Sequence, residues 1–371
     1  MKKNDSQGMD RRTFIKSVGL GAAATLGAPA VVAAQSGKKT AQMGSAEKID
    51  IFPHILTKRF KEVLFKKPKN SFYMKADTVR PALWDLDLRF KSMDKFEGYK
   101  QVLTLSAPPL EFAFSPKEAV DVARMANDEM AELVNKYPDR FVAGVASLPL
   151  NDIDASVRET ERAIKDLKLK GIQMFSTVNG IPIDRPQFLG IYEKMAEYDL
   201  PIWLHPCGDD SLPDYPDEKH SKYTLSLSFG WPYQTTMAMS RLVYSGIMEK
   251  YPNLKVITHH CGAMLPYFMA RAQPAMEPGE VMKVSKPPMK YFKRFYGDTV
   301  LGKNVPALMC GHAFFGTDHM LFGSDYPFPG GPKFYNAALG GGIKAVGAMP
   351  VSGEDKAKIY AKNARRLLRL S

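Results

Sequence analysis

The sequence predicts an α/β protein that folds as a (β/α)8 TIM barrel with insertion loops at the C-terminal face of the barrel. Eight short apolar runs with strand character alternate with segments of helical spacing, and histidine or aspartate follows several of these runs. A chain of 371 residues, 45% hydrophobic and 24% charged, has the size and composition for one large core. A doubly wound open sheet would alternate in the same way, and the polar strand ends favour the closed barrel.

The expected strands are short runs of strongly apolar residues. They cover residues 49–52, 101–105, 141–146, 171–174, 201–204, 255–258, 298–301 and 320–323. Apolar residues at helical spacing lie between them, for example in 120–134, 157–167 and 188–195. Strand followed by helix, repeated along the chain, indicates parallel strands.

Two stretches depart from a minimal strand and helix repeat. Residues 58–94 form a long insertion after the first strand, and residues 208–223 form a polar loop after the fifth. Long loops on the C-terminal side of a barrel commonly cover the substrate. The run Gly340-Gly341-Gly342 is expected to be a flexible turn, since no strand leads into it as a phosphate-binding motif requires.

The first 34 residues are expected to be a twin-arginine export signal. Arg11-Arg12 precedes a weakly apolar run that is diluted by small residues, broken by Pro29 and ended by Val32-Ala33-Ala34. An uncleaved membrane helix is the alternative, but the run is shorter than the roughly 20 residues of a good span. Residues 35–47 are then a linker and residues 48–371 the barrel, which predicts a periplasmic protein exported in its folded state.

The composition favours a small anionic partner. The formal net charge is +12, yet the basic residues are scattered and form no nucleic-acid motif. Three cysteines in a chain of this length do not make a disulfide framework. We therefore expect a small-molecule substrate, no nucleic acid and no stable membrane anchor, and a homodimer stays open.

Side chains that can bind a metal or move a proton follow several of the expected strands. His54 closes the first strand, His205 follows Leu204, and Asp325 follows the last strand. Parallel barrel strands point their C-terminal ends into one mouth, so these side chains are expected to meet there. The alternatives are histidines hydrogen-bonded within the barrel or solvated in a loop, and an aspartate that caps a turn.

Two adjacent histidines, His259 and His260, follow the sixth strand. Adjacent residues of a strand point to opposite sides, so only one of the two is expected to face the mouth. We choose His260, six residues before Pro266, as the site residue and expect His259 to be structural.

The first strand lacks one expected donor. Alternate residues of a strand share a side, so an HxH pair supplies two imidazoles to one metal ion. Here the second position is His54, but the first is Phe52, whose ring has no lone pair to donate. Cys207 or Cys261 could supply a thiolate instead, although buried cysteine more often packs as a small apolar side chain.

The motifs together carry a family resemblance. They are Met93-Asp94, Tyr137-Pro138-Asp139-Arg140-Phe141, Leu200-Pro201-Ile202 before His205-Pro206, the segment from His260 to Pro266, Ser324-Asp325-Tyr326-Pro327, and Asn363-Ala364-Arg365-Arg366-Leu367-Leu368. From about Lys48 to Leu370 the chain resembles the amidohydrolase-2 branch of the amidohydrolase superfamily, which is typified by aminocarboxymuconate semialdehyde decarboxylase and by nonoxidative decarboxylases of hydroxybenzoates.

The resemblance implies a set of roles. In that family the first-strand pair, the fifth-strand histidine and the last-strand aspartate bind a divalent metal, and the sixth-strand histidine acts in catalysis. His54, His205 and Asp325 are therefore the implied metal ligands, and His260 and Asp325 the implied catalytic residues. The implied cofactor is zinc or manganese. Phe52 leaves its occupancy open, since three protein ligands plus water still match a catalytic zinc site in number.

The implied activity is a nonoxidative carboxy-lyase acting on an aromatic or unsaturated carboxylate. Arg89 is one cation that could hold the carboxylate. Two alternatives remain: a hydrolase of a lactone, ester or amide bond that uses the same metal to activate water, and a noncatalytic binding protein derived from the family, which Phe52 motivates.

Overall fold

The computed structural model describes residues 46–68, 75, 77–208, 211, 213–272, 281–328 and 334–370. The expected export signal and all but the last two residues of the expected linker lie outside the described residues. All strands belong to the unit Ser45–Ser371. Among the helices of the described residues, none is long and apolar enough to cross a membrane.

Parallel strands form the centre of this unit. The strands are β1 (Lys48–Asp50), β2 (His54–Ile55), β3 (Tyr99–Leu105), β4 (Phe141–Gly144), β5 (Ala146–Ser147), β6 (Ile172–Phe175), β7 (Thr177–Val178), β8 (Ile181–Pro182), β9 (Pro201–His205), β10 (Lys255–Thr258), β11 (Tyr296–Asp298) and β12 (Met320–Leu321). One sheet pairs β3 with β1, β2 and β4, and a second runs β12-β11-β10-β9-β6-β5. All of these pairs are parallel, and the hairpin β7-β8 is antiparallel.

Backbone hydrogen bonds join the two sheets into a closed barrel. The N–H of Val145, between β4 and β5, donates to Leu103 O at 3.0 Å, and the N–H of Ile51, between β1 and β2, donates to Phe322 O at 2.9 Å. The first strand thereby lies between the second and the last, and the ring of strands closes as in a (β/α)8 barrel.

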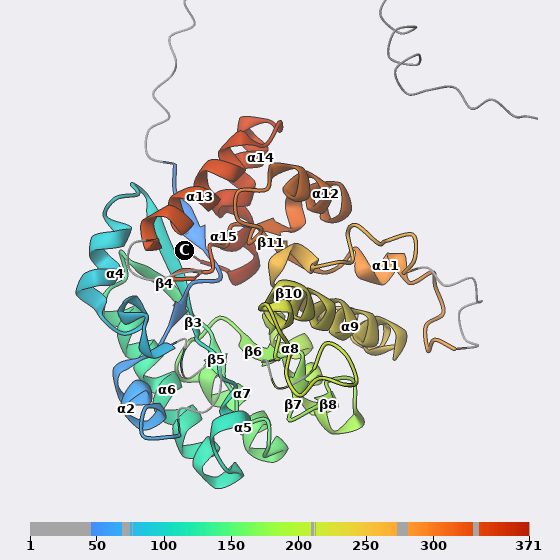
Figure 1. Cartoon of the computed structure of the whole chain (residues 1–371), viewed down its shortest axis with the longest axis horizontal. Helices are drawn as coiled ribbons and strands as arrows, with labels where there is room; N and C mark the ends of the chain where they lie inside the picture. The colour runs from blue at the N-terminus through green and yellow to red at the C-terminus, as the bar shows by residue number, and fades with distance from the viewer. Residues whose placement is uncertain are drawn as a thin grey trace, which may run out of the picture. The chain divides into compact units, whose positions relative to one another are not determined.

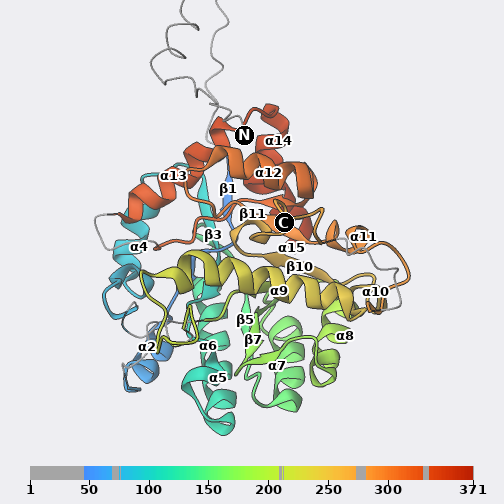
Figure 2. The same cartoon turned by 45° about the vertical axis from the view of Figure 1, so that its right-hand side comes forward.

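Helices surround the central strands (Figures 1 and 2). They are α2 (Lys58–Leu64), η1 (Pro81–Leu83), α4 (Leu86–Met93), α5 (Leu110–Ala113), α6 (Pro116–Lys136), α7 (Ile153–Lys165), η2 (Pro186–Phe188), α8 (Leu189–Tyr198), η3 (Ser226–Gly230), α9 (Trp231–Tyr244), α10 (Ile247–Lys250), η4 (His260–Gly262), α11 (Met289–Phe292), α12 (Val305–Phe315), η5 (Thr317–His319), α13 (Tyr335–Ala348), α14 (Gly353–Ala357), η6 (Lys358–Lys362) and α15 (Asn363–Leu368). The predicted helical segments correspond to α6, α7 and α8. In α6, Ala119, Ala123, Ala126 and Met130 form the buried face at helical spacing.

The hydrophobic core has two main parts. One fills the space between strands and helices. The other joins residues of several barrel strands, among them Ile49, Val102, Trp203, Ile257 and Leu321. The Trp203 indole is fully buried and donates from Nε1 to Ile51 O at 2.8 Å. Such an interior is packed with side chains, so chemistry is confined to the barrel mouth.

Two local predictions are wrong. The seventh strand covers Tyr296–Asp298 and not residues 298–301. It ends there because the Asp298 carboxylate accepts from the N–H of Val300 at 3.0 Å, which turns the chain. The run Gly340-Gly341-Gly342 lies inside α13 and is not a turn. A Cβ on Gly340 would lie 3.1 Å from the Phe96 ring, so close packing of the helix explains this glycine.

Candidate metal-binding active site

His54 is the first residue of β2, at the C-terminal end of the first barrel strand. Its side chain is buried, with Nε2 3.1 Å from Asp325 Oδ1 and Nδ1 3.4 Å from Thr104 Oγ1. Its backbone N–H donates to Tyr326 O at 2.7 Å. Burial lowers the pKa of His54, which favours the neutral imidazole that a metal requires.

His205 is the last residue of β9 and is also buried. Its Nδ1 lies 2.6 Å from the backbone oxygen of Pro206, which fixes the proton on Nδ1 and leaves the lone pair on Nε2. Burial first, and then the nearby imidazoles of His259 and His54, hold the pKa of His205 well below its usual value. The ring therefore presents a neutral nitrogen donor to the mouth.

Asp325 follows β12 with a backbone φ of 62°, a left-handed conformation that non-glycine residues adopt at a cost and often at functional sites. The side chain is 16% exposed, and its Oδ1 lies 3.1 Å from His54 Nε2 and 3.4 Å from His259 Nε2. Burial raises the pKa of Asp325, but its interactions with His259 and His54 outweigh burial and keep the pKa below its usual value. Asp325 is therefore a carboxylate at neutral pH.

The structure differs from the prediction for the two adjacent histidines. In the parallel register Thr258 pairs with Leu204, so His259 lies beside His205 on the neighbouring strand and points the same way. His259 is fully buried in the site. His260 has left the strand with a φ of 54°, and its ring returns to within 4.0 Å of the His259 ring. Both histidines therefore reach the mouth, because the strand ends before His260 and alternation no longer applies.

The surroundings of His259 and His260 shift their pKa values in opposite directions. Burial lowers the pKa of His259, but the carboxylates of Asp298 and Asp325 outweigh burial and raise it to about 9. Burial and repulsion by His259 lower the pKa of His260 to about 3, and its Nδ1 has no hydrogen-bond partner among the described residues. His260 also lies 6.1 Å, ring to ring, from Trp231. Its predicted catalytic role stays a prediction.

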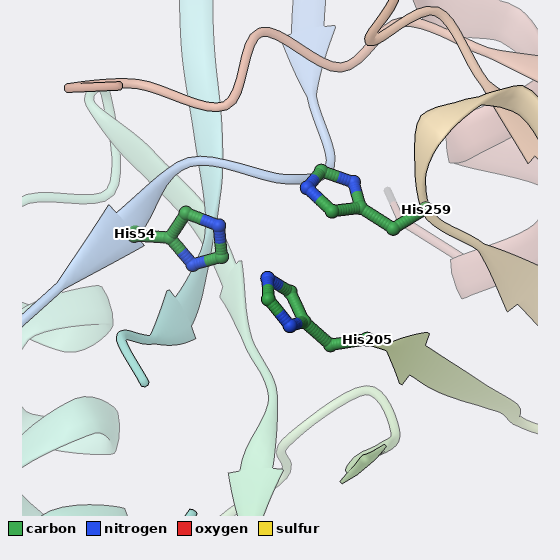
Figure 3. Close-up of side chains that lie close together, drawn as sticks. All are labelled: His54, His205 and His259. Carbon is green, nitrogen blue, oxygen red and sulfur yellow. The ribbon is translucent and has the colours of Figure 1, made fainter. Parts of the chain in front are cut away.

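Three imidazoles converge from separate strands. A first group contains one ligand nitrogen from each of His54, His205 and His259, and these three nitrogens lie within 4.8 Å of one another. A second group, of His259, His260 and Asp325, shares His259 with the first. Figure 3 shows the three rings of the first group arranged around a common space. Phe52 closes one side of this space, with its buried ring stacked on His259 at 4.1 Å between centroids.

The donors fit a divalent transition metal. Imidazole nitrogen and carboxylate oxygen are ligands of zinc and manganese, and nitrogens that share one zinc ion at about 2.0–2.1 Å lie roughly 3.3 Å apart. The ligand nitrogens lie within 4.8 Å of one another, which exceeds that value by at most about 1.5 Å, a difference that side-chain rotations can cover. The buried Nε2 of His259 lies 3.4 Å from Asp325 Oδ1 and has no hydrogen-bond partner in the described part of the chain. A divalent metal would displace the proton that the two carboxylates favour on this ring and would satisfy Nε2.

Two further expectations are changed by the structure. Arg89 is fully buried beneath the site, where it donates to Gln101 Oε1 at 2.6 Å and to the backbone oxygen of His54. It therefore supports His54 and does not face a substrate. Cys261 points away from the histidines, because its Sγ occupies the space where a Cβ on Gly311 of α12 would lie. A thiolate from Cys261 does not compensate for Phe52.

An open cleft lies between the segment after β9, the start of α9 and the segment after η4. It is lined by residues that follow His205 and His260 in the chain, including Gly208, Phe229, Tyr233, Gln234 and Met264. The Trp231 ring lies 5.5 Å from the His205 ring and 6.1 Å from the His260 ring. A smaller cavity at the ends of β3, β5 and β6 is lined in part by Glu111, Ser147, Gln173 and Phe175. The mouth therefore offers apolar and aromatic walls around polar donors, as small-molecule sites do.

Comparison with known proteins agrees with this geometry. Residues 50–370 match the amidohydrolase family Amidohydro_2, and the chain belongs to this family. A 2-amino-3-carboxymuconate-6-semialdehyde decarboxylase from Dictyostelium discoideum is 31% identical over 254 residues, which cover 66% of this chain and 67% of that protein. A gamma-resorcylate decarboxylase from Rhizobium sp. (strain MTP-10005) is 31% identical over 306 residues, which cover 76% and 87% of the two chains.

A solved structure extends the comparison to the fold. The dihydroxybenzoic acid decarboxylase from Polaromonas sp. JS666, with bound manganese and the inhibitor 2-nitroresorcinol, matches with a TM-score of 0.71 and 27% identity. The match covers 87% of this chain and 97% of that one. The predicted family and the predicted (β/α)8 barrel are confirmed, and the chain is an enzyme of the amidohydrolase superfamily whose relatives are carboxy-lyases.

Proposed function

We propose that this enzyme is a metal-dependent nonoxidative decarboxylase of a hydroxylated aromatic carboxylate. The observation that carries the proposal is the convergence of His54, His205, His259 and Asp325 at the C-terminal ends of the barrel strands. Relatives with the same fold decarboxylate related acids, and one of them contains manganese. A divalent metal, manganese or zinc, is the proposed cofactor, with His54, His205 and Asp325 among its ligands.

The proposed reaction replaces a carbon–carbon bond by a carbon–hydrogen bond. Carbon dioxide leaves, and the carbon that carried the carboxylate takes up one proton. A divalent ion in the site would stabilise the negative charge that develops on substrate oxygens during this exchange. The protein must then hold the ring next to a group that delivers the proton to carbon.

Asp325 and His260 are the two groups that we propose for this proton transfer. Asp325 stands at the mouth, 16% exposed, and contacts His54. His260 lies close to His259, and the pKa of His260, lowered to about 3, keeps its imidazole neutral, so one ring nitrogen carries a hydrogen and the other a lone pair. Its orphaned Nδ1 offers a second site for a proton in passage. We propose that Asp325, a carboxylate in the resting site, first takes up a proton from the substrate or from water, with His260 as the relay, and then delivers this proton to the carbon that loses the carboxylate.

The walls of the site suit a flat ring. Trp231 and Phe175 lie edge-on to His205, at 5.5 Å and 5.3 Å between ring centroids. Aromatic side chains in these positions can pack against a planar substrate and exclude water from it. An anionic aromatic acid is thus the proposed substrate class, and the excess of basic over acidic residues would assist its approach.

We also propose, from the sequence of the first 34 residues, that the protein is exported through the twin-arginine route and acts in the periplasm as a soluble enzyme. Fractionation of cells that make the full chain, with and without Arg11→Lys and Arg12→Lys, tests this. Loss of the periplasmic pool in the double variant is expected, and unchanged export would contradict the proposal.

The test of the proposed reaction separates it from hydrolysis. The purified enzyme is loaded with Mn²⁺ and given 2,6-dihydroxybenzoate and other ortho-hydroxylated benzoates, and then aryl esters and lactones. Carbon dioxide release from at least one benzoate, lost in Asp325→Asn, is expected. Acid release from an ester or lactone without carbon dioxide would favour a hydrolase, and no turnover of either group would favour a binding protein.

A further inference from the structure

The absence of a donor at position 52 leaves the metal site one ligand short on the first strand. The centroid of the Phe52 ring lies 6.1 Å from that of His54 and 6.2 Å from that of His205, so the Phe52 side chain enters the space where a second first-strand ligand would reach the ion. That space is not left open. The His259 ring lies flat against the Phe52 ring, at 4.1 Å between centroids and 27° between planes.

His259 is oriented by a carboxylate, as histidines that bind metal ions commonly are. Its Nδ1 lies 2.5 Å from Asp298 Oδ2, and both groups are fully buried. The other oxygen of Asp298 accepts from the backbone N–H of Cys261 at 2.8 Å and of Val300 at 3.0 Å, so the carboxylate cannot turn away. A carboxylate that accepts the second ring N–H of a histidine is the usual support of a metal-bound imidazole.

The remaining nitrogen of His259 points into the site. Nε2 is buried, has no hydrogen-bond partner among the described residues, and lies 3.4 Å from Asp325 Oδ1. The Nδ1 atoms of His54 and His205 face Thr104 and Pro206, so all three rings turn Nε2 toward the same space. An unsatisfied buried nitrogen among two other donors and a carboxylate is costly unless an ion occupies the centre.

We propose that His259, oriented by Asp298, replaces the missing first-strand donor, so that the metal is held by His54, His205, His259 and Asp325. The proposal rests on the metal dependence proposed above and adds a ligand that sequence reasoning treated as structural. Phe52 is then the residue that makes room for His259 and packs against it. His260 lies outside the three-histidine group and is left for proton transfer.

The test measures metal affinity and not turnover. Metal-free enzyme is titrated with Mn²⁺ and with Zn²⁺ by calorimetry, and bound metal is counted by elemental analysis. His259→Asn is the main variant, because the asparagine amide can still donate to Asp298 while Nε2 is lost. His260→Asn is the matched control from the next position, and His54→Asn is the positive control. Circular dichroism and melting curves establish that each variant is folded.

The wild type is expected to bind one metal per chain, and His259→Asn to bind it about 100-fold more weakly or worse. Asp298→Asn should weaken binding by about 10- to 100-fold, since it removes the orienting carboxylate. His260→Asn should stay within about threefold of the wild type. The double variant Phe52→Glu with His259→Asn should regain much of the affinity, because a carboxylate returns beside His54.

The outcomes separate the two proposals. Unchanged affinity in folded His259→Asn, together with loss in His54→Asn, overturns the role of His259 and leaves the proposed function standing. No metal in the wild type at saturating Mn²⁺ or Zn²⁺ overturns the metal dependence itself. If His259→Asn does not fold, the metal affinity of folded Asp298→Asn decides the question. An affinity equal to that of the wild type would then overturn the proposal.

Discussion

Replacing Arg89 by methionine should destabilise the barrel and disturb the site together. The guanidinium is fully buried and makes two charged hydrogen bonds, to Gln101 Oε1 at 2.6 Å and to the backbone oxygen of His54. It also lies 5.1 Å from the centre of the Tyr326 ring. Methionine fills a similar stem volume but donates nothing, so both oxygens lose their donor inside the protein.

The magnitude follows from two opposing effects. Each hydrogen bond from a charged donor contributes roughly 1.5–3 kcal/mol, which sums to about 3–6 kcal/mol for the pair. Removing the buried charge returns part of its desolvation cost, which reduces the net loss. We expect Arg89→Met to lower the free energy of unfolding by about 2–4 kcal/mol, a large part of the roughly 5–15 kcal/mol of a typical domain.

Urea denaturation followed by circular dichroism measures the loss, with the slope m compared between variants. The control is Arg140→Met, which removes a surface arginine paired with Asp94 at 2.5 Å and 37% exposed. An exposed ion pair of this kind contributes at most about 1 kcal/mol. A loss in Arg89→Met no greater than in Arg140→Met, at unchanged m, would refute the assignment of Arg89 as the support of His54.

Other predictions concern stability, pH and metal. Burial raises the pKa of Glu111 from 4.5 to about 7. Folding therefore disfavours ionisation of the Glu111 carboxyl. The free energy of unfolding falls as pH rises from about 4.5 to about 7, by at most about 3 kcal/mol. Urea melts at pH 5 and pH 8 should show a smaller fall in Glu111→Gln than in the wild type, since the raised pKa values of Asp50, Asp77 and His259 contribute to the fall in both proteins; equal falls in the two proteins would contradict the prediction. Trp203→Phe loses the indole hydrogen bond of 2.8 Å and leaves a cavity, so it should cost about 2–4 kcal/mol, and a loss below 1 kcal/mol would speak against a packed barrel interior. Gly311→Ala places a Cβ 2.2 Å from Cys261 Sγ and should cost about 1–3 kcal/mol, whereas Gly353→Ala meets nothing within 4 Å and should change stability by less than about 0.5 kcal/mol; the reverse order in thermal melts would disprove the packing. Removal of metal by a chelator should lower the melting temperature, and Mn²⁺ at 100 times its dissociation constant should restore about 2.7 kcal/mol to the free energy of unfolding. A melting temperature that changes with neither treatment would count against a resident metal.

The fold was largely predictable because it depends on repeated local patterns. Alternating apolar runs and amphipathic segments specify strands and helices wherever they occur, and seven of the eight expected strands overlap the observed ones closely. The seventh strand was misplaced by the apolar pair Val300-Leu301, since the turn at Asp298 depends on a side-chain hydrogen bond that hydrophobicity does not encode. The glycines of α13 were misread because close packing against Phe96 is a tertiary property.

The site was predictable in part. His54, His205 and Asp325 stand directly at strand ends, and the structure brings them together. His259 was missed because alternation was applied across the end of the strand. A usable signal was present: Pro201-Ile-Trp-Leu before His205 and Lys255-Val-Ile-Thr before His259 have the same length, and the observed register aligns them. Asp298 and the buried position of Arg89 could not be predicted, since both are defined by contacts between residues distant in the sequence.

The most direct test of the proposed decarboxylation follows the proton that replaces the carboxylate on the substrate carbon. The Mn²⁺-loaded enzyme is run in D₂O with a hydroxylated benzoate that it turns over, and product and gas are measured by NMR and mass spectrometry. We expect one deuterium at the carbon that lost the carboxylate for each carbon dioxide released, and we expect both to be lost in Asp325→Asn and after removal of the metal. Full activity in Asp325→Asn, or turnover that leaves the carboxylate in place, would contradict it.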